Sequence, residues 1–148
     1  MNYYLNQSMM EIIRKTPYKK VSLSYNIKRI IDEGFVIDNS CVFFSYFKKA
    51  NPHLTEYLFE DKTHWEHTMN GFHLGDYCRK PTINHVFCLV NKLNKLIKDY
   101  SCFPPIIYIS YDNGNYHFSF TTKHSNEKLW ITPDDLNSYS QAILIIEL

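Results

Sequence analysis

The sequence predicts an α+β fold in which N-terminal helices pack on a C-terminal antiparallel sheet. In the first hundred residues, apolar side chains recur at helical spacing, whereas after Pro104-Pro105 the apolar segments are short and have the pattern of strands. Two of these segments flank an Asn-Gly pair, which is typical of a tight hairpin. The chain has 148 residues without a linker-like stretch or an internal repeat, so residues 1–148 are expected to form a single globular domain.

The first part of the chain contains several helical patterns. Apolar residues over 5–13 share one face of a helix that should end before Pro17. A second helix, over 25–33, should end at Gly34, because glycine adopts the left-handed conformation of a C-cap without steric cost. The segment 41–47 fits either a short buried helix or a strand, and we favour the helix. A further helix is expected after Pro52, over 54–65.

The longest helical pattern begins near Thr82, after a glycine-containing loop over 70–80. Lysine and asparagine side chains occupy the face opposite its apolar stripe, which is typical of a helix packed on a core. The stripe consists of Ile83, Val86, Phe87, Val90, Leu93, Ile97 and Tyr100.

The segment 106–121 predicts a β-hairpin whose two-residue turn is Asn113-Gly114. A third strand is expected over 128–131, and a last one, apolar on both faces, over 142–148. Between these two strands, Thr132 as N-cap and Pro133 as the first helical residue predict a short helix. The hairpin register pairs Tyr111 with Tyr116, Ile109 with Phe118, and Ile107 with Phe120 on one apolar face.

The composition indicates a core rich in aromatic rings, since the sequence has 12 Tyr and 10 Phe but alanine only at Ala50 and Ala142. The four cysteines form no C-x-x-C pair. No signal-peptide pattern is evident, and no apolar stretch reaches the roughly 18 residues that cross a bilayer. These observations favour a cytoplasmic protein with reduced thiols and no membrane association.

The net charge of +1 conceals segments of opposite sign. Residues 51–78 form the most acidic segment, and an acidic surface is complementary to a basic protein partner. Exposed tyrosines within such a surface would supply strong contacts. The predicted partner-binding residues are Glu56, Tyr57, Glu60, Asp61 and Glu66, and Trp65 and Tyr77 are further aromatic candidates.

The same segment is rich in histidine. His64 and His67 lie three residues apart on a predicted helix, and imidazole is a common zinc ligand. The following loop adds His73, Asp76 and Cys78, and Cys78 with His73 forms a candidate pair for nucleophilic catalysis. Because no known ligand spacing such as H-E-x-x-H is present, we expect no catalytic residue, cofactor or metal. The alternative is a small metal-dependent or acid–base hydrolase or nuclease that uses the His64/His67 region.

Two other sets of residues suggest contacts with nucleic acid. His117 and His124, near Lys123, are of the types that cleave RNA by acid–base catalysis. Three lysines on the longest helix could contact phosphates, which gives a nucleic-acid-binding module as the second alternative. These lysines are Lys92, Lys95 and Lys98. Nucleic acid is the less favoured partner, because arginine recognises phosphates and bases best and occurs only at Arg14, Arg29 and Arg79.

The compact length, the missing catalytic motifs, the tyrosine-rich composition and the acidic patch of Glu56, Glu60, Asp61 and Glu66 resemble immunity proteins. These are the proteins that accompany bacterial contact-dependent-inhibition and other polymorphic toxins. The resemblance implies a cytoplasmic inhibitor that neutralises a cognate toxin, for instance a nuclease, by occluding its active site. No motif of that class covers a segment of this chain, so the resemblance assigns no role to an individual residue.

Overall fold

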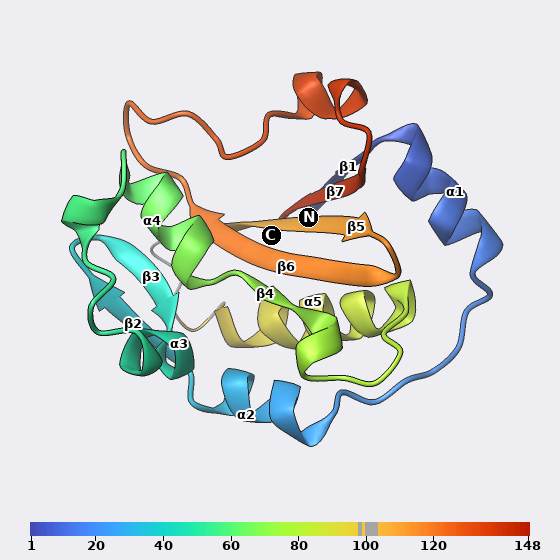
Figure 1. Ribbon diagram of the computed structural model, residues 1–148, viewed down its shortest axis with the longest axis horizontal. Helices are drawn as coiled ribbons and strands as arrows, with labels where there is room; N and C mark the ends of the chain where they lie inside the picture. The colour runs from blue at the N-terminus through green and yellow to red at the C-terminus, as the bar shows by residue number, and fades with distance from the viewer. Residues whose placement is uncertain (98, 100–103) are drawn as a thin grey trace.

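The computed structural model describes residues 1–97, 99 and 104–148. Within these ranges, five strands form an antiparallel sheet in the order β1-β7-β5-β6-β4, and β2 and β3 form a second, smaller one (Figure 1). The α+β class is therefore confirmed. The larger sheet comprises β1 (Asn2–Leu5), β4 (Phe72–His73), β5 (Pro105–Asp112), β6 (Asn115–Thr122) and β7 (Ala142–Glu147); the smaller one comprises β2 (Phe35–Asp38) and β3 (Cys41–Phe44).

Two of the α-helices follow residues of the types that favour N-cap positions. The side chain of Asn6 accepts a hydrogen bond from Met9 N, and that of Ser24 accepts one from Ile27 N. None of the helices in the described ranges has the length and apolar character needed to cross a membrane. The α-helices are α1 (Gln7–Lys15), α2 (Tyr25–Asp32), α3 (Ser45–Ala50), α4 (Lys62–Met69) and α5 (Ile83–Ile97); short 3₁₀ helices are η1 (Glu56–Leu58), η2 (Leu74–Asp76) and η4 (Pro133–Ser138).

The predicted hairpin and its register are confirmed. Asn113 and Gly114 have φ angles of 48° and 84°, as a type I′ turn requires. The final apolar segment is also a strand as expected, and β7 lies between β1 and β5. The hairpin pairs Tyr111 with Tyr116, Ile109 with Phe118, and Ile107 with Phe120.

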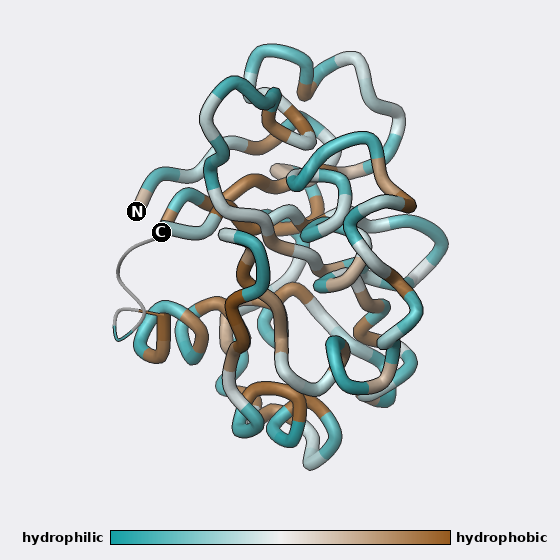
Figure 2. The backbone as a smooth tube through the Cα atoms, turned by 90° about the vertical axis from the view of Figure 1, so that its left-hand side faces the viewer, coloured by the Kyte–Doolittle hydropathy of each residue, from teal (hydrophilic) through white to brown (hydrophobic). Residues whose placement is uncertain are grey.

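The main cluster of buried apolar side chains combines α1, α2 and α5 with one face of β5, β6 and β7. Figure 2 shows these apolar stretches gathered in the interior. The predicted stripe of α5 belongs to this cluster, with Phe87 only half-buried, and Tyr100 lies outside the described residues. A second cluster covers the opposite face of β5 and β7, where Tyr108 and Ile143 pack against Leu136. Burial on both faces explains why β5 is apolar over residues 105–109 and β7 over residues 142–146.

Two helix predictions are wrong in part. The segment 41–47 is not a helix: strand β3 covers Cys41–Phe44, and α3 begins only at Ser45. The expected helix over 54–65 is interrupted, because η1 ends at Leu58 and α4 begins at Lys62. Asp61 separates the two, since its side chain caps α4 by accepting a hydrogen bond from His64 N at 2.7 Å.

One strand prediction and the predicted start of the first helix also differ from the structure. Residues 128–131 form no strand, and the Trp130 ring instead stacks on His67. The first residues were expected to lead into a helix at Leu5, but Asn2–Leu5 is strand β1, paired with β7. The expected loop over 70–80 contains the short elements β4 and η2. The short helix after Thr132 is present as η4, although the Thr132 side chain makes no capping hydrogen bond.

Candidate functional site

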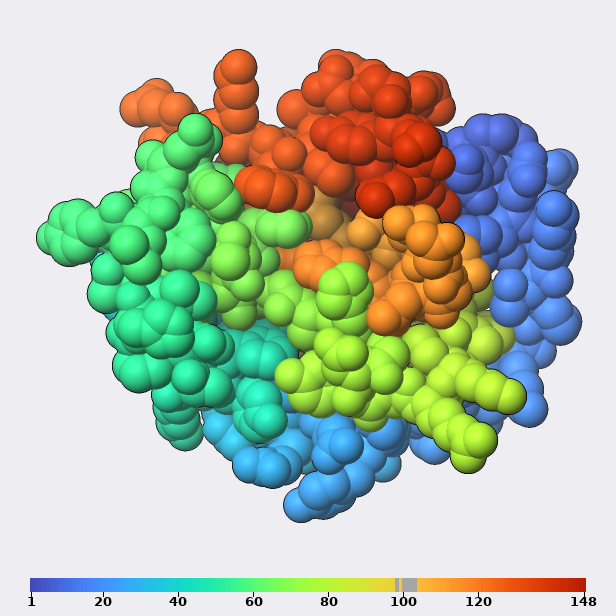
Figure 3. All heavy atoms as spheres, viewed as in Figure 1, coloured from blue at the N-terminus to red at the C-terminus, as the bar shows by residue number. Residues whose placement is uncertain are grey.

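The acidic segment projects from the fold at η1, which lies at the left of the views in Figures 1 and 3. Tyr57 is 95% exposed and Leu58 is 63% exposed. The Glu56 carboxylate accepts a hydrogen bond from Asn39, which ties η1 to the turn between β2 and β3. Glu60 is exposed next to this helix. We call Glu56, Tyr57, Leu58 and Glu60 the η1 surface.

The other aromatic candidates do not extend the η1 surface. Trp65 is 2% exposed, and its indole N–H donates to the carbonyl of Leu54 at 3.0 Å. Tyr77 is half-buried and packs edge-on against Phe47 and Phe72. Both rings are therefore part of the packing. The prediction that Trp65 contacts a partner is wrong, because its ring is buried, and for the half-buried Tyr77 it stays a prediction.

Glu66 was predicted to bind a partner, and that prediction is also wrong, because the residue is completely buried. Its carboxylate accepts four hydrogen bonds. Oε1 accepts from Val42 N at 2.6 Å and from Thr122 Oγ1 at 2.8 Å, while Oε2 accepts from Thr122 N at 2.7 Å. The fourth partner is His124 Nε2, at 2.9 Å from Oε2. A buried charge is tolerated only with such a complete set of partners.

Asn70 lies one helical turn after Glu66 and completes the same junction. Its Oδ1 accepts from Phe44 N at 2.9 Å, and its Nδ2 donates to the carbonyls of Val42 and Phe120 at 2.9 and 3.2 Å. The outward backbone groups of β3 are thus bonded to side chains of α4 instead of to another strand. Sequence reasoning missed Asn70, because its partners are 26 to 50 residues away along the chain.

The ligand atoms of Cys41, Glu66 and His124 lie within 4.8 Å of one another, the one such group of three in the described part of the chain. By residue type this set suits a transition metal. However, burial raises the pKa of Cys41, which keeps its sulfur a protonated thiol. The hydrogen bond to Glu66 raises the pKa of His124, which favours an ion pair between them. Without a metal ion, the group is thus an ion pair with a packed thiol beside it.

The predicted metal candidates form a different arrangement, a row of rings across α4, β6 and β4. His67 stacks on Trp130 with ring centroids 4.0 Å apart, and His117 follows at 5.7 Å. His73 is 5.0 Å from His117, opposite it in the β4–β6 register. His64 lies at the other end, 5.4 Å from Trp130. We call these four histidines with Trp130 the histidine row; its members touch as rings and do not converge as a ligand set.

The lowered pKa values of His67 and His117 disfavour acid–base catalysis by this pair. A cavity of about 240 Å³ is lined by His67, His117 and Tyr108 among others. Burial lowers the pKa of His67 to about 3, and burial together with His73 lowers the pKa of His117. Both imidazoles are then neutral near pH 7, so the pair has a base but no general acid. His124, the other candidate for RNA cleavage, is held by Glu66.

The remaining candidates are placed as follows. Cys78 is buried, burial raises its pKa, and its sulfur donates to the Arg79 carbonyl, so it has no thiolate character. Lys92 and Lys95 lie on the exposed face of α5, and Lys98 lies outside the described residues.

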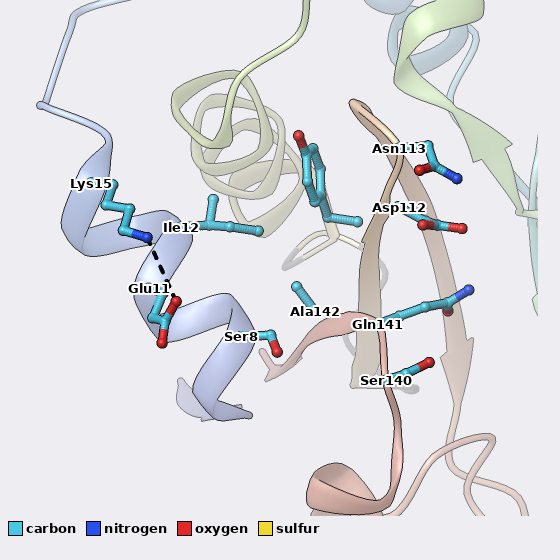
Figure 4. A pocket seen from close by; sticks show the side chains of 10 residues that line it. Ser8, Glu11, Ile12, Lys15, Asp112, Asn113, Ser140, Gln141 and Ala142 are labelled. Atoms are coloured by element: carbon cyan, nitrogen blue, oxygen red, sulfur yellow. Dashed lines mark ion pairs between the residues drawn. The ribbon is translucent and has the colours of Figure 1, made fainter.

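A cavity of about 420 Å³ between α1 and the hairpin turn is a further hollow in the surface (Figure 4). Glu11 and Lys15 pair with each other across 3.7 Å on its rim. Apart from this pair and Asp112, its lining holds no charged group. The cavity therefore does not bring several titratable side chains together as the surroundings of α4 do.

A family model described as the uncharacterized protein PM0498 family matches residues 4–148. The chain belongs to this family. All the described elements except the first two residues of β1 lie within the matched range, so the junction at Glu66 lies in the part of the chain that the PM0498 family model covers. No curated protein and no solved structure matches the chain.

Proposed function

We propose that this PM0498-family protein acts by binding another protein, as a cytoplasmic immunity-type inhibitor that occludes the active site of a cognate bacterial toxin. The observation that carries the proposal is the exposure of Tyr57 at 95% beside two carboxylates. Such an exposed tyrosine is available as an anchor for a partner. On binding, its large ring becomes buried in the interface at a low cost in conformational entropy.

The chemistry of the η1 surface favours a basic partner. Glu56 and Glu60 flank Tyr57 and Leu58, so a central apolar pair is bordered by negative charge. Interfaces commonly have this anatomy, with an apolar centre and a polar rim. A nuclease toxin that binds phosphates would present a basic active site, and the carboxylates of the η1 surface would replace those phosphates.

The experiment first asks whether a reading frame beside this gene encodes a toxin domain, whose absence would contradict the proposal, and then measures binding of that domain by calorimetry to the wild-type protein and two variants. Tyr57→Ala should weaken binding by about 2 kcal/mol or more, and Glu60→Lys should slow association. Tyr25→Ala is the matched control, since Tyr25 is also exposed, at 77%, but lies on α2. Unchanged affinity in both test variants would refute the η1 surface as the interface, and absence of any complex would refute the proposed function.

A further inference from the structure

A groove lies between the segment that joins α1 to α2 and the exposed face of α5. Two cavities of about 460 and 590 Å³ adjoin there, since both are lined by residues 19–22 and by Asn84. The wall opposite residues 19–22 contains Phe87, Lys92 and Lys95 of α5. We call this feature the lysine groove. Its lysines are Lys19, Lys20, Lys28, Lys80, Lys92 and Lys95.

The charge of the lysine groove is unbalanced. No aspartate or glutamate lines either cavity. The ion pairs of the described residues use Lys15, Arg29, Lys48, Lys49 and His124, and none of the six groove lysines. The ammonium groups therefore repel one another in the free protein, and an anion that enters the groove relieves this repulsion.

The groove is held in shape by contacts between its walls. Asn84 of α5 donates to the Pro17 carbonyl at 3.1 Å, and the Cys88 thiol donates to the Val21 carbonyl at 3.7 Å. Ser24, at the end of the segment, donates to the Tyr77 carbonyl at 2.6 Å. The lysines of the segment are therefore presented from a fixed backbone, which reduces the entropy lost on binding.

Aromatic rings accompany the charges. Tyr18 lies at the groove with 88% of its surface exposed, and Phe87 is half-buried in the wall. Lysines that contact a phosphate backbone, together with rings on which bases stack, are the two components of sites for single-stranded nucleic acid. Lysine also suits contacts that do not discriminate between sequences, because base-specific recognition relies mainly on bidentate side chains.

We infer that the lysine groove is a binding site for single-stranded nucleic acid, without sequence specificity. The backbone phosphates lie along Lys19, Lys20, Lys92 and Lys95, and a base stacks on Tyr18. The site is separate from the η1 surface, so it does not depend on the proposed inhibitor function. The sequence alone disfavoured nucleic acid because arginine is scarce, and the lysines of the two walls, about 70 residues apart along the chain, converge only in the fold.

The test measures fluorescence anisotropy of labelled oligo-U, oligo-dT and a DNA duplex over a salt series. Affinity for both single strands should fall with salt, with a slope of about −0.7 per phosphate contacted. Lys19→Glu/Lys92→Glu should weaken binding at least about tenfold near 0.1 M salt and flatten the slope. Tyr18→Ala should weaken single-strand binding and leave the slope unchanged, since stacking releases no counterions.

The matched control is Lys123→Glu/Lys128→Glu, which changes the net charge equally at exposed lysines outside the groove. Retained affinity in this control, with loss in the groove variant, supports the inference. Equal losses in both variants would overturn it, because binding would then follow total charge. It is also overturned if no single strand binds at low salt, or if poly-glutamate or the duplex binds as tightly as oligo-U.

Discussion

The Glu66 carboxylate and the His124 imidazole form an ion pair at 2.9 Å, with side chains that are 0% and 8% exposed. The pair joins the middle of α4 to the segment that follows β6. Since Glu66 also accepts hydrogen bonds from Val42 and Thr122, one carboxylate connects three segments that are distant in sequence. The carboxylate at this position therefore holds these segments together and is not part of the outer surface.

Replacement of Glu66 should be among the most destabilising single substitutions in the chain. Glu66→Ala leaves two backbone N–H groups without partners and removes the ion pair of a buried imidazole, at a cost of about 3–5 kcal/mol in the free energy of unfolding. Glu60→Ala, on the exposed surface nearby, should change it by no more than about 0.5 kcal/mol. Urea denaturation of both variants measures the difference. Similar small effects of the two substitutions would contradict the structural role of Glu66.

His124 should make stability depend on pH in the alkaline direction. The hydrogen bond to Glu66 raises its pKa above that of the unfolded chain, which is about 6.5. Its stabilising contribution is therefore fully present below about pH 6.5 and is lost as pH rises through the folded-state pKa. His124→Gln should cost more stability at about pH 5.5 than at about pH 8.5. An equal cost at both values would show that the imidazole is neutral in the folded protein.

His67 should produce the opposite dependence. Its pKa is lowered to about 3 by burial, so between about pH 6.5 and 3 the unfolded chain binds a proton that the folded protein does not. Stability should fall as pH decreases through this interval, by less than about 1.4 kcal/mol per pH unit because His67 is only partly shielded from water.

Substitution isolates this contribution. His67→Phe keeps a ring against Trp130 and should flatten the acid branch of a stability–pH curve measured by urea denaturation. His53→Phe, at an exposed position, is the control and should leave the curve unchanged. A wild-type slope in His67→Phe would contradict the depressed pKa.

Two glycine substitutions separate backbone strain from crowding. Gly114 has φ of 84° and open space where a Cβ would lie, so Gly114→Ala should cost about 1–2 kcal/mol through strain alone. Gly71 lacks a left-handed φ, but a Cβ there would lie 2.9 Å from His117 Nε2 and 3.0 Å from the His67 carbonyl. Gly71→Ala should therefore shift the His117 ring resonances in an NMR spectrum, whereas Gly114→Ala should not.

Local signals account for what the sequence predicted correctly. Asn113-Gly114 determines the hairpin register, because both residues accept positive φ and the flanking alternation agrees with the turn. The apolar stripe of α5 could likewise be predicted from its helical spacing alone, without knowing which residues it packs against. Strand β1 was missed because it is four residues long and pairs with β7 at the other end of the sequence. Strands β2 and β3 are equally short and pair with each other across Asn39-Ser40, a turn with positive φ at both residues but without the glycine that signals such turns.

The candidate site was less predictable for a related reason. Glu56, Glu60 and Glu66 are equivalent as charges in the sequence, yet two are at the surface and the third is buried. What distinguishes them is the position of donors from β3 and β6, which are up to 56 residues from Glu66. Lys19 and Lys92 show the reverse case, in which the fold unites charges that the sequence separates.

The bonds from Glu66 and Asn70 to β3 also bear on how the protein behaves at high concentration. A strand with free N–H and C=O groups along one side can recruit the same strand of another molecule, which begins aggregation. Here Val42 and Phe44 already donate to side chains of α4, and the Val42 carbonyl already accepts from Asn70. Two polar side chains on one helix thus protect this edge of the small sheet from self-association, without an additional strand.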